Sequence, residues 1–190
     1  MIELLETIKI EDSKILNIKW HNQRCNKSRL ELFQEKKLLS LEEFIEPPKE
    51  GLYRCRILYD KDINSVEYIP YTPKKINSFK IVQSNIDYSY KYGNREELNA
   101  LHNPDYDEVI IEKDGYLTDT SIANIAFYDG TNWFTPASPL LKGTIREKLL
   151  SERFLIVKNI KSQDIQSYSH FALMNAMIGF QIQKSIQIKL

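Results

Sequence analysis

The sequence predicts an α+β fold. Segments in which apolar residues alternate, typical of strands, are mixed with a few helical segments, and the two kinds do not follow each other in regular strand–helix–strand units. The chain has 190 residues, of which 42% are hydrophobic and 27% charged, so it can bury a substantial core. We expect a small α/β domain over residues 1–75 and a larger mixed-sheet domain over residues 76–190, with a connector at residues 72–75.

The first half of the chain is expected to form strands and one long helix. The clearest strand covers residues 51–60, where an apolar or aromatic residue recurs at every second position from Tyr53 to Tyr59. A short helical segment ends at Pro47 and Pro48, because helices seldom cross prolines. The other elements expected here are strands at residues 4–10, 15–18 and 65–71 and helices at residues 20–30 and 41–45.

The second half is expected to mix strands with short helices. A strand over residues 80–90 leads to Lys91. A hairpin over residues 107–128 has one strand, a turn at residues 113–115 and a second strand. The remaining elements expected are strands at residues 133–135, 154–158, 170–177 and 178–188 and helices at residues 96–101, 142–152 and 162–168.

Composition and charge argue against several classes of function. Lys plus Arg and Asp plus Glu number 26 each, so there is no electrostatic case for binding nucleic acid or an anionic membrane. Cys25 and Cys55 give neither a disulfide framework nor the spacing of metal ligands. The first residues include acids where a signal peptide has bases, and no apolar stretch approaches the ~20 residues of a transmembrane helix. We therefore expect a cytoplasmic globular protein.

Lys91 is the first candidate for chemistry. It lies between Tyr90 and Tyr92, where the expected strand gives way to a helix. Partial desolvation among aromatic rings disfavours the ammonium form and lowers the pKa of the amine, as a Schiff-base lysine requires. On residue type alone, a solvated surface lysine is the commoner interpretation.

Two turns are candidates for binding a phosphate. Gly143 and Thr144 begin a helix, where free backbone N–H groups and the positive helix end attract an anion. The simpler interpretation is that Thr144 is an N-cap hydroxyl and Gly143 a turn residue. Asn175 and Ala176 follow a strand and could supply a further N–H group at a turn.

Two charged residues have a structural and a functional interpretation. Arg24 follows His21 by one helical turn, and a solvated helix face explains it on residue type alone. Asp119 lies in a strand near Leu117 and Ile122. An acid in such a place is either exposed at an edge or held by a specific partner.

The order and spacing of these residues resemble the class IV aminotransferases, the fold-type IV pyridoxal-phosphate enzymes. This family includes branched-chain aminotransferase, D-amino acid aminotransferase and aminodeoxychorismate lyase. The resemblance extends from about residue 4 to residue 180 and depends on several motifs together. These are His21 and Arg24 for H-x-x-R, Lys91, Asn94 and Arg95 for the K-x-x-N-R of the lyases, Thr118, Asp119 and Asn124 for T-E-x-x-x-x-N, Leu141, Gly143 and Arg146 for L-x-G-x-x-R, and Asn175, Ala176 and Met177 for a closing turn.

The resemblance implies pyridoxal 5'-phosphate as the cofactor and assigns roles to the candidates. Lys91 would hold the cofactor through a Schiff base and then act as general base and acid. Asp119 would keep the ring nitrogen protonated, so that the ring serves as an electron sink. The phosphate would be held by Arg24, Thr144 and the backbone near Ile145, Asn175 and Ala176. Tyr88, Tyr90 or Tyr92 would contact the ring, and Arg54, Arg56 or Arg95 a substrate carboxylate.

The sequence departs from the family pattern in two ways. Asp119 stands where the family has a glutamate, so its carboxyl group lies one methylene closer to the strand. The section usually found before E-T-x-[RK] is missing, since Glu6 and Thr7 come almost at once, and the distance from Arg24 to Lys91 is also shorter. Both losses fall on the small domain, which in relatives covers the substrate side.

Three functions are compatible with this resemblance. A 4-amino-4-deoxychorismate lyase would release pyruvate and leave 4-aminobenzoate for folate synthesis, and Asn94, Arg95 and the turn at Asn175 favour it. An aminotransferase of the D-amino acid or branched-chain type is the first alternative. A non-catalytic pyridoxal-phosphate-binding protein is the second. Relatives are homodimers, so we expect a homodimer acting on a small amino substrate.

Overall fold

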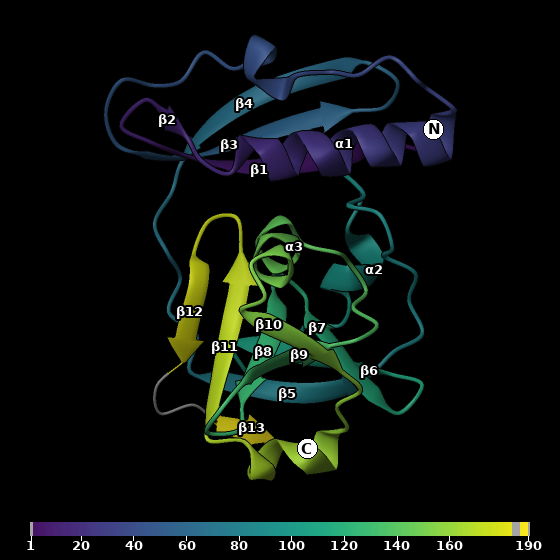
Figure 1. The fold of residues 1–190 in the computed structure, drawn as a ribbon, viewed down its shortest axis with the longest axis vertical. Coiled ribbons are helices and arrows are strands. Elements are labelled where there is room, and N and C mark those ends of the chain that lie inside the picture. Colours follow the sequence, from purple (N-terminus) through teal and green to yellow (C-terminus); the bar gives the residue numbers. More distant parts are fainter. Residues whose placement is uncertain (1, 184–186, 190) are drawn as a thin grey trace. The chain divides into compact units, whose positions relative to one another are not determined.

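The computed structural model describes residues 2–183 and 187–189, which form two compact units (Figure 1). The first unit contains residues 1–73 and 90–94, and the second contains residues 74–89 and 95–190. Each unit has its own sheet and its own core. The expected α+β class, with a smaller first part and a larger mixed sheet, is confirmed.

The first unit is an antiparallel sheet covered on one face by a helix (Figure 1). The strand order is β2-β1-β3-β4, and consecutive neighbours are antiparallel. Its elements are β1 (Leu4–Glu11), β2 (Lys14–Ile15), α1 (Ile18–Phe33), the 3-10 turn η1 (Leu41–Phe44), β3 (Leu52–Tyr59) and β4 (Ile63–Pro70).

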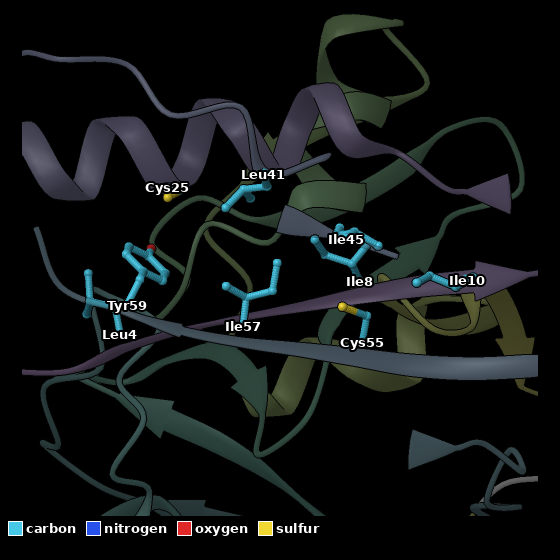
Figure 2. Packing of buried hydrophobic residues seen from close by; sticks show 9 residues of the cluster. All are labelled: Leu4, Ile8, Ile10, Cys25, Leu41, Ile45, Cys55, Ile57 and Tyr59. Atoms are coloured by element: carbon cyan, nitrogen blue, oxygen red, sulfur yellow. The ribbon is translucent and has the colours of Figure 1, made fainter. Parts of the chain in front are cut away.

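Alternation along β1 and β3 builds the core of the first unit. Every second residue of each strand faces α1, and most of these side chains are buried. Figure 2 shows Ile8 and Ile57 on the strands and Cys25 on α1 within this cluster. Most of the buried face of β1 is apolar, but Glu6 shares it and is fully buried. A charge in that place must have a partner.

The second unit is built on a larger mixed sheet. The described strands follow the order β10-β9-β8-β7-β6-β5-β13, and β11 pairs with both β8 and β12. Three pairs are parallel: β5 with β6, β13 with β5, and β10 with β9. The elements are β5 (Ser78–Gln83), α2 (Glu96–Asn99), β6 (Glu108–Lys113), β7 (Tyr116–Thr120), β8 (Asn124–Tyr128), β9 (Trp133–Pro136), α3 (Thr144–Ser151), β10 (Leu155–Lys158), the 3-10 turn η2 (Ser162–Ser167), β11 (His170–Asn175), β12 (Gly179–Gln183) and β13 (Gln187–Lys189).

Aromatic rings fill much of the second core. Phe171 lies between Phe79 and Phe127, with ring centroids 5.2 and 5.1 Å apart. Such edge and tilted arrangements are favourable for aromatic pairs. On another part of the sheet, Ile145 of α3 packs against a second cluster that includes Ala172 of β11. This packing fixes the start of α3 relative to β8 and β11.

The expected second strand of the hairpin over residues 107–128 is two strands in the structure. β7 ends at Thr120 and β8 begins at Asn124. In the turn between them, the Thr120 hydroxyl accepts from Ala123 N at 2.9 Å, and Thr120 N donates to Ala123 O at 2.9 Å. A threonine can close such a turn with its own hydroxyl, so the chain reverses without a glycine or proline signal.

Other boundaries also differ from expectation. The strand expected over residues 80–90 ends at Gln83, and the helices expected at residues 41–45 and 162–168 are short 3-10 helices. The strand expected over residues 178–188 crosses residues 184–186, which lie outside the described part. In the described residues, no helix is both long and apolar enough to cross a membrane.

Lys91 belongs by its contacts to the first unit, whereas the sequence predicts it in the domain of residues 76–190. Leu5 N donates to Lys91 O at 2.8 Å, and Gly93 N donates to Glu3 O at 2.8 Å. Leu4 and Tyr92 form an antiparallel bridge. On this edge β2 pairs with β1 at Ile10 and Glu11, so the beginning of β1 is open to the segment around Lys91.

Candidate active site

Three polar side chains form a buried cluster in the first unit. Glu6 extends from the helix-facing side of β1, and His21 and Arg24 lie one turn apart on α1. Arg24 Nε donates to Glu6 Oε1 at 2.8 Å, and Arg24 Nη2 donates to Glu6 Oε2 at 2.6 Å. His21 Nδ1 lies 2.5 Å from Glu6 Oε2. This two-pronged pairing fixes both the plane and the position of the guanidinium group.

The cluster fixes the charges of its members. Burial alone raises the pKa of Glu6, but the charge and hydrogen bonds of Arg24 and the hydrogen bond from His21 outweigh it and lower the pKa to about 2. Burial lowers the pKa of His21 against the effect of Glu6, and the positive charges of Arg24 and Lys91 add to this lowering. His21 is therefore a neutral imidazole that donates from Nδ1 to an ionised Glu6.

Lys91 lies close enough to this cluster for its charge to act on His21. Its carbonyl is held by Leu5 N, the residue before Glu6. Its side chain is half-buried. Thus β1 positions Glu6 on its helix-facing side and the backbone of Lys91 at its edge. The structure brings Arg24, His21 and Lys91 into one unit, whereas the sequence predicts Arg24 in the first domain and Lys91 in the second.

Asp119 is the central acid of the second unit. It lies on β7 and is 4% exposed. Its Oδ1 accepts from Asn124 Nδ2 at 2.6 Å, and its Oδ2 accepts from Leu141 N at 2.9 Å. Burial raises its pKa to about 7, although the Leu141 N–H, the Asn124 amide and the charge of Arg146 each lower it. Of the two interpretations of Asp119, the one with specific partners is correct.

The start of α3 differs from the capping interpretation. The N-cap residue is Gly143, which has no side chain to cap with, and Thr144 is the first helical residue. An intrahelical bond runs from Glu147 N to Gly143 O. The N–H groups of Thr144 and Ile145 come earlier in the helix, so they have no acceptor four residues back within it. The interpretation of Thr144 as an N-cap hydroxyl is wrong, and these amides remain suited to an anion.

Asn175 ends β11 and closes the turn into β12. Its Oδ1 accepts from Met177 N at 2.9 Å and Ile178 N at 3.0 Å. Its Nδ2 donates to Ile122 O at 3.2 Å. The side chain of Asn175 is therefore engaged in shaping the turn that contains Ala176. In the sheet, Met174 is the register partner of Asn124, so this turn lies beside the strand that carries the Asp119 partner.

Sequence reasoning did not assign a role to Glu6, Asn124 or Arg146. The sequence does contain a sign that Glu6 is buried, because it is an acid on the otherwise apolar, alternating face of β1. Arg146 is 3% exposed and donates from Nη2 to Pro136 O at 3.0 Å. Its charge also favours the ionised form of Asp119. These residues support the assigned ones, and the structure shows their partners.

The other sequence candidates lie in varied surroundings. Arg56 pairs with exposed Glu67 at 3.0 Å, and Arg95 donates to Ser121 O at 2.6 Å. The hydroxyl of Tyr90 donates to Glu31 at 3.2 Å. Tyr88 lines a pocket of about 270 Å³ in the second unit, together with Lys113, Thr118 and Leu140 among others.

The first unit contains Lys91 and the fixed Arg24, and the second unit contains the buried Asp119 and the open start of α3. The family model of the class IV aminotransferases matches residues 3–186, and the chain belongs to that family. It is therefore a pyridoxal-phosphate-dependent enzyme.

Two similar proteins match this chain over nearly its whole length. An uncharacterized protein of Haemophilus influenzae is 37% identical over 187 residues, which are 94% of this chain and 100% of that protein. A crystal structure from Haemophilus somnus, named as a candidate 4-amino-4-deoxychorismate lyase, is 38% identical with a TM-score of 0.85 and covers 94% of this chain and 98% of its own.

More distant structures share the fold. A candidate amino-acid aminotransferase from Mesorhizobium loti is 20% identical, with a TM-score of 0.78 and full coverage of both chains. A hypothetical aminotransferase from Mycobacterium tuberculosis, solved in its PLP-bound form, is 15% identical with a TM-score of 0.78 and covers 99% of this chain and 81% of its own.

The residues present fit pyridoxal phosphate. The first-turn amides of α3, which have no acceptor within the helix, suit a phosphate group. Asp119 is buried, and a positive partner would stabilise its ionised carboxylate. A protonated ring nitrogen would be such a partner. Lys91 supplies the amine. Within the second unit, the start of α3 therefore suits the phosphate and Asp119 suits the ring nitrogen of the cofactor.

Proposed function

We propose that the protein is a 4-amino-4-deoxychorismate lyase, which releases pyruvate and leaves 4-aminobenzoate for folate synthesis. The observation that carries this proposal is the similarity to the Haemophilus somnus structure of that name, at 38% identity over nearly the whole of both chains. The K-x-x-N-R pattern of Lys91, Asn94 and Arg95 supports it, because this pattern resembles the lyases.

In this proposal Lys91 is the catalytic residue. Its amine takes a proton from the substrate and returns one to the product, as a general base and then an acid. The charges of Lys91 and Arg24 both act on His21 and favour its neutral form. The bound cofactor supplies an electron sink for the pair left on the substrate carbon. Asp119 supports this by keeping a negative charge opposite the ring nitrogen.

The phosphate is assigned to a guanidinium and a helix start. Glu6 fixes Arg24 in orientation, so the arginine loses little conformational freedom when it meets an anion. The backbone amides of Thr144 and Ile145 donate from the first turn of α3, and the turn at Asn175 and Ala176 adds a further N–H group.

A product assay tests the proposal. Purified protein loaded with pyridoxal phosphate is incubated with aminodeoxychorismate, and pyruvate and 4-aminobenzoate are measured. We expect both products in equal amounts. Amino transfer from D-alanine or a branched-chain amino acid, without these products, would instead assign the protein to the aminotransferases. Bound cofactor without turnover of any amine would support a non-catalytic binding protein.

Covalent labelling tests the role of Lys91 separately. Borohydride reduction followed by peptide mapping should place the pyridoxyl group on Lys91. Lys80, which lies on β5 in the second unit, serves as the internal comparison. A label on Lys80 or on any other lysine would contradict the assignment of Lys91.

We also propose that the enzyme is a cytoplasmic homodimer acting on a small amino substrate, without nucleic acid or a membrane. The zero net charge supports the last two points. Exposed apolar side chains on and beside β10, at the end of the sheet order, support a subunit contact: Phe154, Ile156 and Val157 are 44%, 44% and 52% exposed.

A further inference from the structure

The side chain of Asn124 contacts separate parts of the second unit. It lies at the start of β8 and is 5% exposed. Its Nδ2 donates to Asp119 Oδ1 at 2.6 Å and to Leu141 O at 2.8 Å. Its Oδ1 accepts from Gly143 N at 3.1 Å. One buried amide therefore links the acid on β7 to the segment that opens α3.

An amide is the group that these partners require. Asp119 and Leu141 O present acceptors, and Gly143 N presents a donor. An asparagine offers two N–H donors and a carbonyl acceptor, so each meets a partner. An aspartate of the same shape would turn an oxygen toward Asp119 and Leu141 O, and a leucine would leave all of these groups unsatisfied in a buried place.

Gly143 provides independent evidence that this contact is built into the fold. A Cβ atom at this position would come within 2.1 Å of Asn124 Oδ1. The backbone angles of Gly143, φ −70° and ψ 148°, are accessible to any residue. The glycine is therefore required by the close approach of the amide rather than by its conformation.

We propose that Asn124 is a positioning residue that holds Asp119 and the start of α3 in one fixed arrangement. A single side chain then sets both the acid assigned to the ring nitrogen and the amides assigned to the phosphate. The consequence for the cofactor rests on the proposed function. The coupling between Asn124, Asp119 and Gly143 is a property of the protein itself and can be measured without the cofactor.

The coupling has a definite sign. Donation from Nδ2 favours the ionised form of Asp119 and so lowers its pKa. Removing the donor should raise the pKa of Asp119 further above its ordinary value. At neutral pH the acid would then be mostly protonated and would lose its charge toward a ring nitrogen.

Titration of the cofactor-free protein tests this sign. The side-chain carboxyl carbon of Asp119 is followed by NMR from pH 4 to 10 in the wild type, in Asn124→Ala and in a control, Asn132→Ala, which alters an exposed asparagine of the same unit. We expect the Asp119 midpoint in Asn124→Ala to rise by roughly one pH unit, because a hydrogen bond to a charged group is lost. The control should titrate as the wild type does. An unchanged midpoint in Asn124→Ala would overturn the proposal.

The wild type alone gives a second measurement, which holds even if Asn124→Ala does not fold. The side-chain N–H signals of Asn124 should shift with the same midpoint as Asp119. The side-chain signals of Asn132 should not follow that midpoint. Asn124 signals that ignore the Asp119 titration would overturn the proposal.

Cofactor affinity tests the link to α3. Pyridoxal phosphate binding is measured by absorbance for Asn124→Ala, Gly143→Ala and the double variant. We expect each single variant to bind about tenfold more weakly or worse. The double variant should bind no more weakly than the worse single one, because both changes break the same contact. Losses that multiply would contradict the coupling.

The outcomes separate this inference from the proposed function. A wild type that binds no pyridoxal phosphate contradicts the proposed function, and the titration then still decides whether Asn124 and Asp119 are coupled. A wild type that binds the cofactor, together with an Asp119 midpoint that Asn124→Ala leaves unchanged, overturns the role of Asn124 and leaves the proposed function intact.

Discussion

Two buried carboxylates of this protein have opposite protonation behaviour. Glu6 meets a guanidinium and an imidazole, so its pKa falls to about 2 in spite of burial. Asp119 meets amide donors and a more distant arginine, so burial prevails and its pKa rises to about 7. The difference follows from the partners, since both side chains are fully enclosed. Glu6 is thus ionised at every pH above about 2, whereas Asp119 can change its charge near neutral pH.

The low pKa of Glu6 predicts a loss of stability in acid. Its ordinary value is 4.5, so the stabilisation is complete above that pH and is lost as pH falls toward 2. The cofactor-free protein should lose roughly 3 kcal/mol over this range. Urea unfolding at a series of pH values measures the loss. Glu6→Gln should lack this pH dependence, whereas Glu67→Gln, at an exposed ion pair, should retain it. The same acid profile in Glu6→Gln would contradict the assignment.

The raised pKa of Asp119 predicts the opposite trend at higher pH. In the folded state Asp119 keeps its proton up to about pH 7, whereas in the unfolded chain it loses the proton near its ordinary pKa of 3.8. The free energy of unfolding therefore falls as pH rises from 3.8 through about 7. Urea unfolding of cofactor-free protein between pH 5 and 8 should show this decline. Asp119→Asn should have a flatter profile, whatever its stability at one pH. An equal decline in wild type and variant would assign the effect to another group.

The sequence identified the candidate site residues by their motifs, but it did not show which side chains pair. Arg24 could be related to a phosphate by its motif, yet its bond to Glu6 joins a helix to a strand and depends on how α1 lies on β1. The Asn124 bonds likewise depend on the turn between β7 and β8. Residue spacing does not determine such contacts, because they form only when separate elements pack.

At the scale of elements, the alternating strands could be predicted and their ends could not. β1 and β3 bury one face against α1, so their side-chain period shows in the sequence. The break between β7 and β8 at residues 121–123 was not predicted, because the Thr120 hydroxyl closes the turn without a glycine or proline. Lys91 was assigned to the second domain because chain order suggested it, whereas backbone pairing with β1 puts it in the first unit.

Arg29 holds the end of α1 against the backbone at Lys37 and Lys61. It is 2% exposed and donates from Nε and Nη2 to Lys61 O and from Nη1 to Lys37 O. Arg29→Met should lower the free energy of unfolding by about 2–4 kcal/mol, because the carbonyls of Lys61 and Lys37 lose a charged donor. Chemical denaturation measures this. Arg56→Met, which removes an exposed ion pair, should cost less than about 1 kcal/mol. If Arg29→Met and Arg56→Met lower the free energy of unfolding equally, Arg29 does not anchor the chain at Lys37 and Lys61.

At the scale of the whole molecule, the balanced charge and exposed apolar edge favour self-association over binding to a polyanion. β10 stands at one end of the strand order in the described sheet, and an edge strand offers backbone groups to a partner. Phe154 also packs edge-on against Phe180 at 5.2 Å, which keeps this apolar surface ordered. A second copy of the chain is the partner we propose for it.

Val157 gives this proposal a direct test. Its side chain is 52% exposed on β10, so Val157→Glu should leave the fold of a single chain intact. If β10 lies in the subunit contact, the new carboxylate is buried there without a partner. The dissociation constant of the dimer should then rise by about tenfold or more. Sedimentation over a range of concentrations measures the change, and circular dichroism checks the fold. Leu38→Glu, at a 77% exposed leucine of the first unit, is the matched control and should remain dimeric. If Val157→Glu dimerises as tightly as the wild type, β10 does not form the subunit contact. A wild type that sediments as a monomer at every concentration rules out the homodimer itself.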